Sequence, residues 1–287
     1  MALKLVTDST ADISKKAAEK LGIGILEIPV FSEHGEIRQS VAAEERKTDT
    51  EFSVFHAMRS GRRFRTEAIS MEDYLSYFRI YAAAGDAVIY CCTSSELSQN
   101  YTHAKAARRR LLMEYPAFEF HIIDSNEISL GMGVPVMIAA QEILNGAPYD
   151  RVYRRLLFDC MHQKLIFVAS DVRYLVPDAE QTSLQHPHFL DIVPVLEIAT
   201  SGRLSLIERT RDMGNAVERL LQLAGQYGTS LSGKTAGIVH ADAEPLAEHL
   251  RNELQKRYGV TGFVTECVSD AVAVHVGPDA VGIVFEY

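Results

Sequence analysis

The first half of this chain is organised by the stretch Leu-Val-Thr-Asp-Ser-Thr-Ala-Asp at residues 5–12, where apolar residues run directly into hydroxyl and carboxyl side chains. The pattern returns as Ile-Tyr-Cys-Cys-Thr-Ser-Ser-Glu-Leu-Ser at 89–98 and as Ile-Ile-Asp-Ser-Asn-Glu-Ile-Ser at 122–129. Segments with a helical spacing of apolar residues, 71–81 and 101–115, lie between these strand-like runs. Strands that alternate with helices predict a parallel sheet covered on both faces.

The three polar turns have two interpretations. In an open parallel sheet the turns after the strands gather at the carboxyl edge, where ligands bind. Ser, Thr and Asp at such places also cap the following helices, for about 1 kcal/mol each. Three turns of this kind at one edge, one of them with three consecutive hydroxyls, favour a polar pocket suited to a carboxylate or phosphate.

The second half is richer in strands, and two helices interrupt them at 213–224 and 246–258. The late strands follow one another with short turns, which suggests mixed or antiparallel pairing. We place the boundary between the halves near residue 155. The predicted strands of the second half are 164–169, 191–198, 203–208, 235–240, 262–268, 271–276 and 281–285.

Composition excludes several classes of protein. The 29 basic and 38 acidic residues give a net charge of −9, which argues against nucleic-acid binding and against a polybasic membrane anchor. No segment has the length of a membrane span, and the chain begins without the apolar core of a signal peptide. The four cysteines lack a C-x-x-C spacing and are expected to be free thiols. We therefore expect a cytoplasmic protein without stable membrane insertion.

Common enzyme motifs do not occur in the sequence. Gly131 and Gly133 lack the third glycine of a dinucleotide fingerprint, and there is neither a Walker A sequence nor a Gly-x-Ser-x-Gly elbow. His186 and His188 have no acidic or cysteine partner at ligand spacing, so we expect a surface loop and no metal. Residues 272–285 predict a strand, a Gly-Pro turn and a second strand, with His275 at the sheet rim, where its ring can donate to an anion.

Six stretches, in order and spacing, resemble the DegV family, the bacterial fatty-acid-binding proteins also called FakB, almost from end to end. They are Thr-Asp-Ser-Thr-Ala-Asp at 7–12, Ser-Ser-Glu-Leu-Ser-x-x-Tyr at 94–101, Asp-Ser-x-x-x-Ser-x-Gly-x-Gly at 124–133, Asp-Val-Arg-Tyr-Leu at 171–175, Pro-Val-Leu at 194–196 and His-Val-Gly-Pro-x-Ala-x-Gly-Ile-x-Phe at 275–285.

The resemblance implies a Rossmann-like α/β domain with a parallel sheet at 1–155 and a mixed-sheet α/β domain at 156–287, with a long-chain fatty acid in an apolar tunnel between them. It implies a carrier rather than an enzyme: the protein presents the carboxylate to the ATP-binding subunit of a fatty-acid kinase and needs no cofactor.

The resemblance also assigns residues. The family's carboxylate ligands match Thr66, the pair Ser94 and Ser95 (Ser95 is favoured) and His275. The docking arginines match Arg173 and Arg209. The polar turns and the Gly-Pro turn add four positions at the pocket edge, which are Ser9, Ser125, Gly131 and Gly277.

Three stretches depart from the family pattern. Ser98-Gln99-Asn100 has lost a glycine, Glu67 puts a negative charge beside Thr66, and residues 176–181 lack the family's glycine and arginine, which bears on partner docking.

Two other classes of function stay open. An enzyme acting on a small carboxylated or phosphorylated metabolite requires a polar pocket with a strongly perturbed acid or base. A diverged member that binds another lipid, or only a partner, requires a blocked or shortened tunnel.

Overall fold

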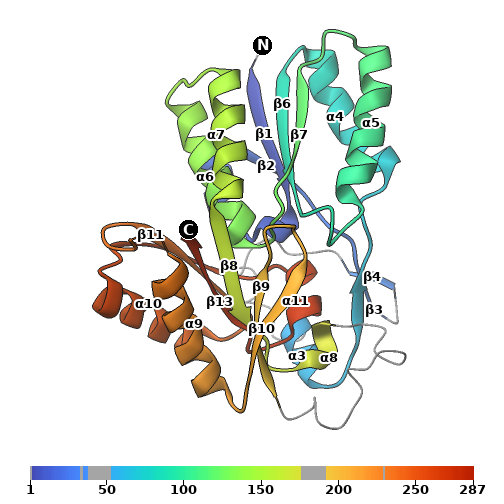
Figure 1. The fold of residues 1–287 in the computed structure, drawn as a ribbon. Coiled ribbons are helices and arrows are strands. Elements are labelled where there is room, and N and C mark those ends of the chain that lie inside the picture. The colour runs from blue at the N-terminus through green and yellow to red at the C-terminus, as the bar shows by residue number, and fades with distance from the viewer. Residues whose placement is uncertain (1, 33–34, 38–52, 176–191, 229) are drawn as a thin grey trace.

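The first half folds around a four-stranded parallel sheet in the order β2-β1-β6-β7 (Figure 1). The structure is a computed structural model that describes residues 2–32, 35–37, 53–175, 192–228 and 230–287. Because all four strands are parallel, their carboxyl ends meet at one edge. The strands are β1 (Leu3–Asp8), β2 (Ile23–Leu26), β6 (Ala87–Cys92) and β7 (Phe120–Asp124).

Helices cover both faces of this sheet, as the alternating strand and helix patterns predict. Leu5 and Ile89 face α1, α6 and α7 on one side, whereas Val6 and Tyr90 face α4 and α5 on the other. Neighbouring residues of a strand point to opposite faces, so both layers of core come from the same short strands. The helices are α1 (Lys15–Leu21), α4 (Met71–Ala84), α5 (Asn100–Glu114), α6 (Leu130–Leu144) and α7 (Tyr149–Met161).

The second half contains a six-stranded mixed sheet in the order β10-β9-β8-β13-β11-β12. Its pairs are antiparallel except for the parallel pair of β11 and β12. The mixed sheet that the short turns predicted is therefore confirmed. The strands are β8 (Gln163–Val168), β9 (Val193–Ile198), β10 (Leu204–Thr210), β11 (Thr235–His240), β12 (Gly262–Cys267) and β13 (Val281–Glu286).

The two faces of the mixed sheet are covered differently. Helices α9 (Met213–Tyr227) and α10 (Glu244–Tyr258) pack on the outer face. The inner face, which includes Phe167 and Val239, shares one apolar core with residues of the first half such as Tyr90. Among the described residues, no helix is long and apolar enough to cross a membrane.

A small antiparallel sheet was not predicted. It has the order β4-β3-β5 and lies beside the short helices α3 and α8 at the lower end of the molecule in Figure 1. The predicted strand 25–31 is in fact two strands in two sheets, because Pro29 interrupts the run. The elements are β3 (Val30–Ser32), β4 (Gly35–Ile37), β5 (Phe64–Thr66), α3 (Val54–Arg59) and α8 (Val172–Leu175).

One predicted strand is wrong. Residues 271–276 belong to the helix α11 (Asp270–Val276). Alternating valines suggested a strand, but the Ser269 side chain accepts a hydrogen bond from the Val272 amide and Asp270 lies in the first turn, both of which favour a helix start. His275 therefore lies in the last turn of a helix and not at the end of a strand.

The predicted boundary at residue 155 falls inside α7. The buried apolar residues of that helix, Val152, Leu156 and Cys160, all pack in the core of the parallel sheet. We propose that the first domain extends through α7 and that the second begins with β8.

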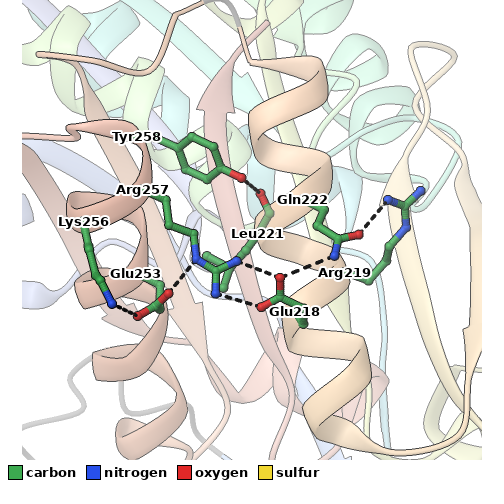
Figure 2. Close-up of polar contacts among 8 residues, drawn as sticks. All are labelled: Glu218, Arg219, Leu221, Gln222, Glu253, Lys256, Arg257 and Tyr258. Atoms are coloured by element: carbon green, nitrogen blue, oxygen red, sulfur yellow. Dashed lines mark hydrogen bonds and ion pairs between the residues drawn. The ribbon is translucent and has the colours of Figure 1, made fainter.

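Ion pairs join the outer surfaces of α9 and α10 (Figure 2). The Arg257 guanidinium donates to both carboxylate oxygens of Glu218, at 2.7 and 2.9 Å, and to Glu253 of its own helix. The Tyr258 hydroxyl donates to the Leu221 carbonyl at 2.9 Å. The hydrogen bond from Arg257 holds the pKa of Glu218 below its usual 4.5.

We expect Glu218→Gln to lower the free energy of unfolding by less than about 1 kcal/mol, because the pair is exposed to water. The loss is largest at low salt and neutral pH. It disappears in 1 M NaCl, and also as the pH falls through the lowered pKa of Glu218. Urea unfolding at two salt concentrations measures it, with Glu248→Gln on the exposed face of α10 as the control. An equal loss at both salt concentrations would contradict the ion-pair account.

Candidate functional site

A cavity of about 330 Å³ lies between the two halves of the protein. The first half contributes residues at the carboxyl edge of the parallel sheet, including Thr10 and Thr93. The second half contributes apolar residues of the inner sheet face, such as Phe167 and Val239, together with α11. Most of the cavity wall is apolar, and its volume is within the range of small-molecule sites.

Thr66 and His275 form the most specific polar contact on the wall. Thr66 ends the edge strand β5, His275 lies in the last turn of α11, and the Thr66 Oγ1 and His275 Nε2 atoms are 2.8 Å apart. The structure thus brings together two predicted site residues that are 209 positions apart in the chain. Burial lowers the pKa of His275 below its usual 6.5, so the ring is neutral at pH 7.

The segment after Thr66 is anchored to α5. The Ile69 amide donates to the Asn100 side chain at 3.0 Å, and the Ile69 carbonyl lies 2.8 Å from Nδ1 of His103. Asn100 is fully buried and lines the cavity, so this residue of the altered stretch 98–100 has a local structural role. Glu67 also lines the cavity, and its carboxylate is paired with Arg65.

A buried carboxyl group organises the hydroxyls at the sheet edge. Asp8 ends β1 and accepts hydrogen bonds from both the amide and the hydroxyl of Thr10 and of Thr93. The Tyr90 hydroxyl donates to the same carboxyl at 3.2 Å and lies 2.8 Å from the hydroxyl of Tyr74. Burial raises the pKa of Asp8, and the hydrogen bonds from Thr10 and Thr93 partly offset that effect.

The structure does not bring the predicted serines to the cavity wall. Ser94 is buried, and its hydroxyl donates to the Gly202 carbonyl at 2.8 Å, whereas Ser95 is exposed. The neighbouring residue Thr93 lines the cavity instead, and Thr10 does so in place of Ser9. Thr93 and Thr10 lie in turns that follow β6 and β1, where packing and not strand alternation sets the direction of each side chain.

The other predicted edge residues support the backbone and do not line the cavity. The Ser9 side chain accepts from the Ile28 amide, and the Ser125 hydroxyl donates to the Glu127 carbonyl. A Cβ atom at Gly131 would meet the Glu127 carboxyl, and one at Gly277 would meet the ring of Tyr174. The two serines and the two glycines therefore have roles in local hydrogen bonding and packing.

The two predicted docking arginines lie in different places. Arg209 is exposed on β10. Arg173 on α8 lines a second hollow of about 510 Å³ together with four more arginines, which are Arg59, Arg62, Arg63 and Arg65. We call this hollow the arginine groove. The altered stretch 176–181 and the histidines at 186 and 188 lie outside the described residues.

The arginine groove and the cavity share one wall. Arg65 lines the groove while Thr66 lines the cavity, and the same division holds for Tyr174 and Leu175 and for residues 274 and 275. Three of the groove's arginines already have acidic partners: Arg59 pairs with Asp242 and Asp279, Arg65 with Glu67, and Arg173 with Asp171. Within the part of the chain that the structure describes, no group of three metal-ligating side chains occurs.

Comparisons with known proteins agree with this geometry. A fatty acid-binding protein of Thermotoga maritima is 27% identical, with 100% of this chain and 98% of the relative aligned. A solved DegV lipid binding protein from the same organism has a TM-score of 0.85 at 26% identity, covering 100% of this chain and 98% of that one.

The fatty acid kinase B3 protein of Streptococcus pneumoniae, solved with linoleic acid, has a TM-score of 0.82 at 15% identity, with 100% and 99% of the two chains covered. That likeness shows a common fold. The parallel sheet and the mixed sheet are thus the architecture of one family. The model of the family described as uncharacterised DegV proteins matches residues 2–287, and this chain belongs to the DegV family.

Proposed function

We propose that this protein binds a long-chain fatty acid in the cavity between its halves and holds the carboxylate at Thr66 and His275. The observation that carries the proposal is a mostly apolar cavity with the uncharged pair Thr66 and His275 on its wall. A relative of similar length, 27% identical, is a fatty acid-binding protein.

The apolar wall would supply most of the affinity. Each methylene group moved from water into such an environment contributes about 0.8 kcal/mol. Phe167, Ile198 and Val239 of the mixed sheet and Val272 of α11 all line the cavity, so an acyl chain there contacts the inner sheet face. The overall charge of −9 matters little for this contact, because burial rather than long-range attraction holds the chain.

The pair Thr66 and His275 suits a carboxylate. In the tautomer with the proton on Nε2, the ring donates to the Thr66 oxygen, which leaves the hydroxyl proton of Thr66 for the ligand. A hydrogen bond to an ionised acceptor is stronger than one between neutral groups. Since neither residue carries a charge at pH 7, the carboxylate is oriented without a salt bridge and stays available for reaction.

We further propose that the carboxylate is presented to a fatty-acid kinase that docks on the arginine groove. The groove shares its wall with the cavity, so a partner seated there lies close to Thr66 and His275. Arg62 and Arg63 have no ion pair among the described residues, which leaves two positive charges for an acidic partner. The fold is shared with the fatty acid kinase B3 protein of Streptococcus pneumoniae.

The alternative of an enzyme acting on a small metabolite has less support. It requires a perturbed acid or base that reaches the substrate, and Asp8, whose pKa burial raises, is a candidate two residues before the cavity residue Thr10. Both oxygens of Asp8 are already engaged by Thr10, Thr93 and Tyr90, and its side chain does not line the cavity. The largely apolar wall favours a carrier.

The fatty acid should be recovered with the purified protein and identified by mass spectrometry after extraction. We expect Thr66→Val, which keeps the volume and removes the hydroxyl, to weaken fatty-acid binding about tenfold, the typical effect of losing a hydrogen bond to a charged group. Thr265→Val, at an exposed position of β12, is the matched control.

Two results would count against this reading. Absence of any fatty acid after extraction, together with no uptake of added acid, would remove the carrier function. Unchanged affinity of Thr66→Val would remove the headgroup site while leaving the carrier function in place.

Fatty-acid binding should raise the pKa of His275. The free ring titrates below 6.5 because it is buried, and a nearby carboxylate favours the charged ring. Binding then takes up a proton, so affinity increases as the pH falls from the higher pKa of the complex to the lower pKa of the free protein. NMR titration measures both values, with a fatty alcohol of equal length as the control ligand. An equal pKa in the free and loaded protein would place the carboxylate elsewhere.

Docking can be separated from lipid binding. We expect Arg62→Ala with Arg63→Ala to reduce kinase-dependent formation of acyl phosphate severalfold, with fatty-acid affinity unchanged, because these arginines line the groove and not the cavity. Arg173→Ala tests the docking residue of the family in the same assay. The control is Arg154→Ala on the exposed surface of α7. Full phosphorylation by the double variant would exclude the groove as the docking surface.

A further inference from the structure

Asp12 connects three segments that meet beside the cavity. It follows the 3-10 turn Ser9–Ala11, and only 4% of its surface is exposed. One carboxylate oxygen accepts the Ser129 hydroxyl, at the start of α6, and the other accepts the Ser269 amide at 2.6 Å, at the start of α11. A single buried side chain of the first half therefore holds the helix that carries His275.

We infer that Asp12 is a positioning residue for the headgroup site, because it fixes the start of α11 and thereby sets His275 against Thr66. The inference rests on the proposed function of that pair. The inference extends that function to Asp12, a residue that does not line the cavity.

The position of the His275 ring depends strongly on how α11 begins. The helix has seven residues, and His275 lies six residues beyond Ser269, which is roughly 9 Å along the axis. A tilt of about 10° at the first turn would displace the ring by roughly 1.5 Å, enough to break its 2.8 Å contact with Thr66. A small change in the direction of α11 at Ser269 therefore produces a larger displacement of His275.

The backbone around Asp12 is held in unfavourable conformations. Asp12 has a φ of 52° and Ser129 has a φ of 57°, and both are non-glycine residues in the left-handed half of the φ range. Such backbone persists only where the surrounding contacts fix it, and it is frequent at functional sites. Here the two residues bond to each other, and the Ser129 amide also donates to the Thr10 carbonyl at 2.7 Å.

The chemistry of the side chain explains why an aspartate is needed. Both incoming groups are donors, one hydroxyl and one amide, so both atoms of the side chain must accept. An asparagine of the same shape offers one acceptor and one donor, and its NH2 group cannot accept either bond. In Asp12→Asn the Ser129 hydroxyl must turn and accept from the NH2 group, so a hydrogen bond to a carboxylate becomes a weaker neutral one, without creating a cavity.

The test measures His275 directly. We expect Asp12→Asn to shift the ring nitrogen resonances of His275 away from their hydrogen-bonded values. We also expect the ratio of the affinities for a free fatty acid and for its methyl ester to fall about tenfold. The matched control is Asp159→Asn, a buried aspartate of α7 that pairs with Arg155. A merely structural loss would weaken acid and ester equally and leave the ratio unchanged.

The outcomes are distinct. The inference is overturned if Asp12→Asn leaves the ratio and the His275 resonances unchanged, or if Asp159→Asn changes them as much. If Asp12→Asn does not fold, Ser129→Ala removes one bond to Asp12 and must produce the same shift of His275 in smaller measure. The NMR measurement needs no ligand, so it still decides the role of Asp12 if the parent protein proves to bind no fatty acid.

Discussion

The inner face of the mixed sheet must be buried, and among the described residues it shares its core with the first half of the chain and with α11. Phe167 and Val239 from that face lie in the same apolar core as Val6 and Tyr90 from the parallel sheet. Burial of this shared surface holds the two halves together. The cavity is the part of the shared core that side chains leave unfilled, which is why its walls come from both halves and are mostly apolar.

The polar side chains in and around this shared core are held by hydrogen bonds. Three polar side chains at or near the cavity illustrate how their hydrogen bonds are satisfied. Asp8 has its hydroxyl partners, Asn100 has the Ile69 amide, and Thr66 has the ring of His275. Leaving a buried polar atom without a hydrogen bond costs more free energy than forming that bond gains. The partners of these hydrogen bonds therefore fix the direction of each side chain. The side chains of the site are therefore oriented by the hydrogen bonds that the buried polar groups form.

The periodic parts of the fold could be predicted from the sequence. β1, β6 and β7 are runs of apolar residues that end in polar turns, and the helices between them have a clear spacing. The helix α11 could not be predicted in this way, since its alternating valines also fit a strand and a serine cap decides the outcome. The small sheet was missed because its strands have only three residues each.

The residues of the site were harder to predict from the sequence. Thr66 and His275 come from distant segments, and only the resemblance to the DegV family placed them together. The wall residues Thr10 and Thr93 have the right chemistry in the sequence, but the direction of a side chain in a turn is set by packing. A buried carboxyl group before a run of hydroxyls, as at Asp8, is the signal that could have identified them.

The contact between Ser94 and Gly202 has a consequence for how this protein can change in evolution. Gly202 has a φ of 83°, and a Cβ atom there would collide with the Ser94 hydroxyl. The connection between β9 and β10 is thus fitted to the turn after β6, although the two belong to different sheets. A side chain at position 202 therefore requires a matching change at Ser94. A replacement of either segment has to preserve the fit between the two sheets at this contact.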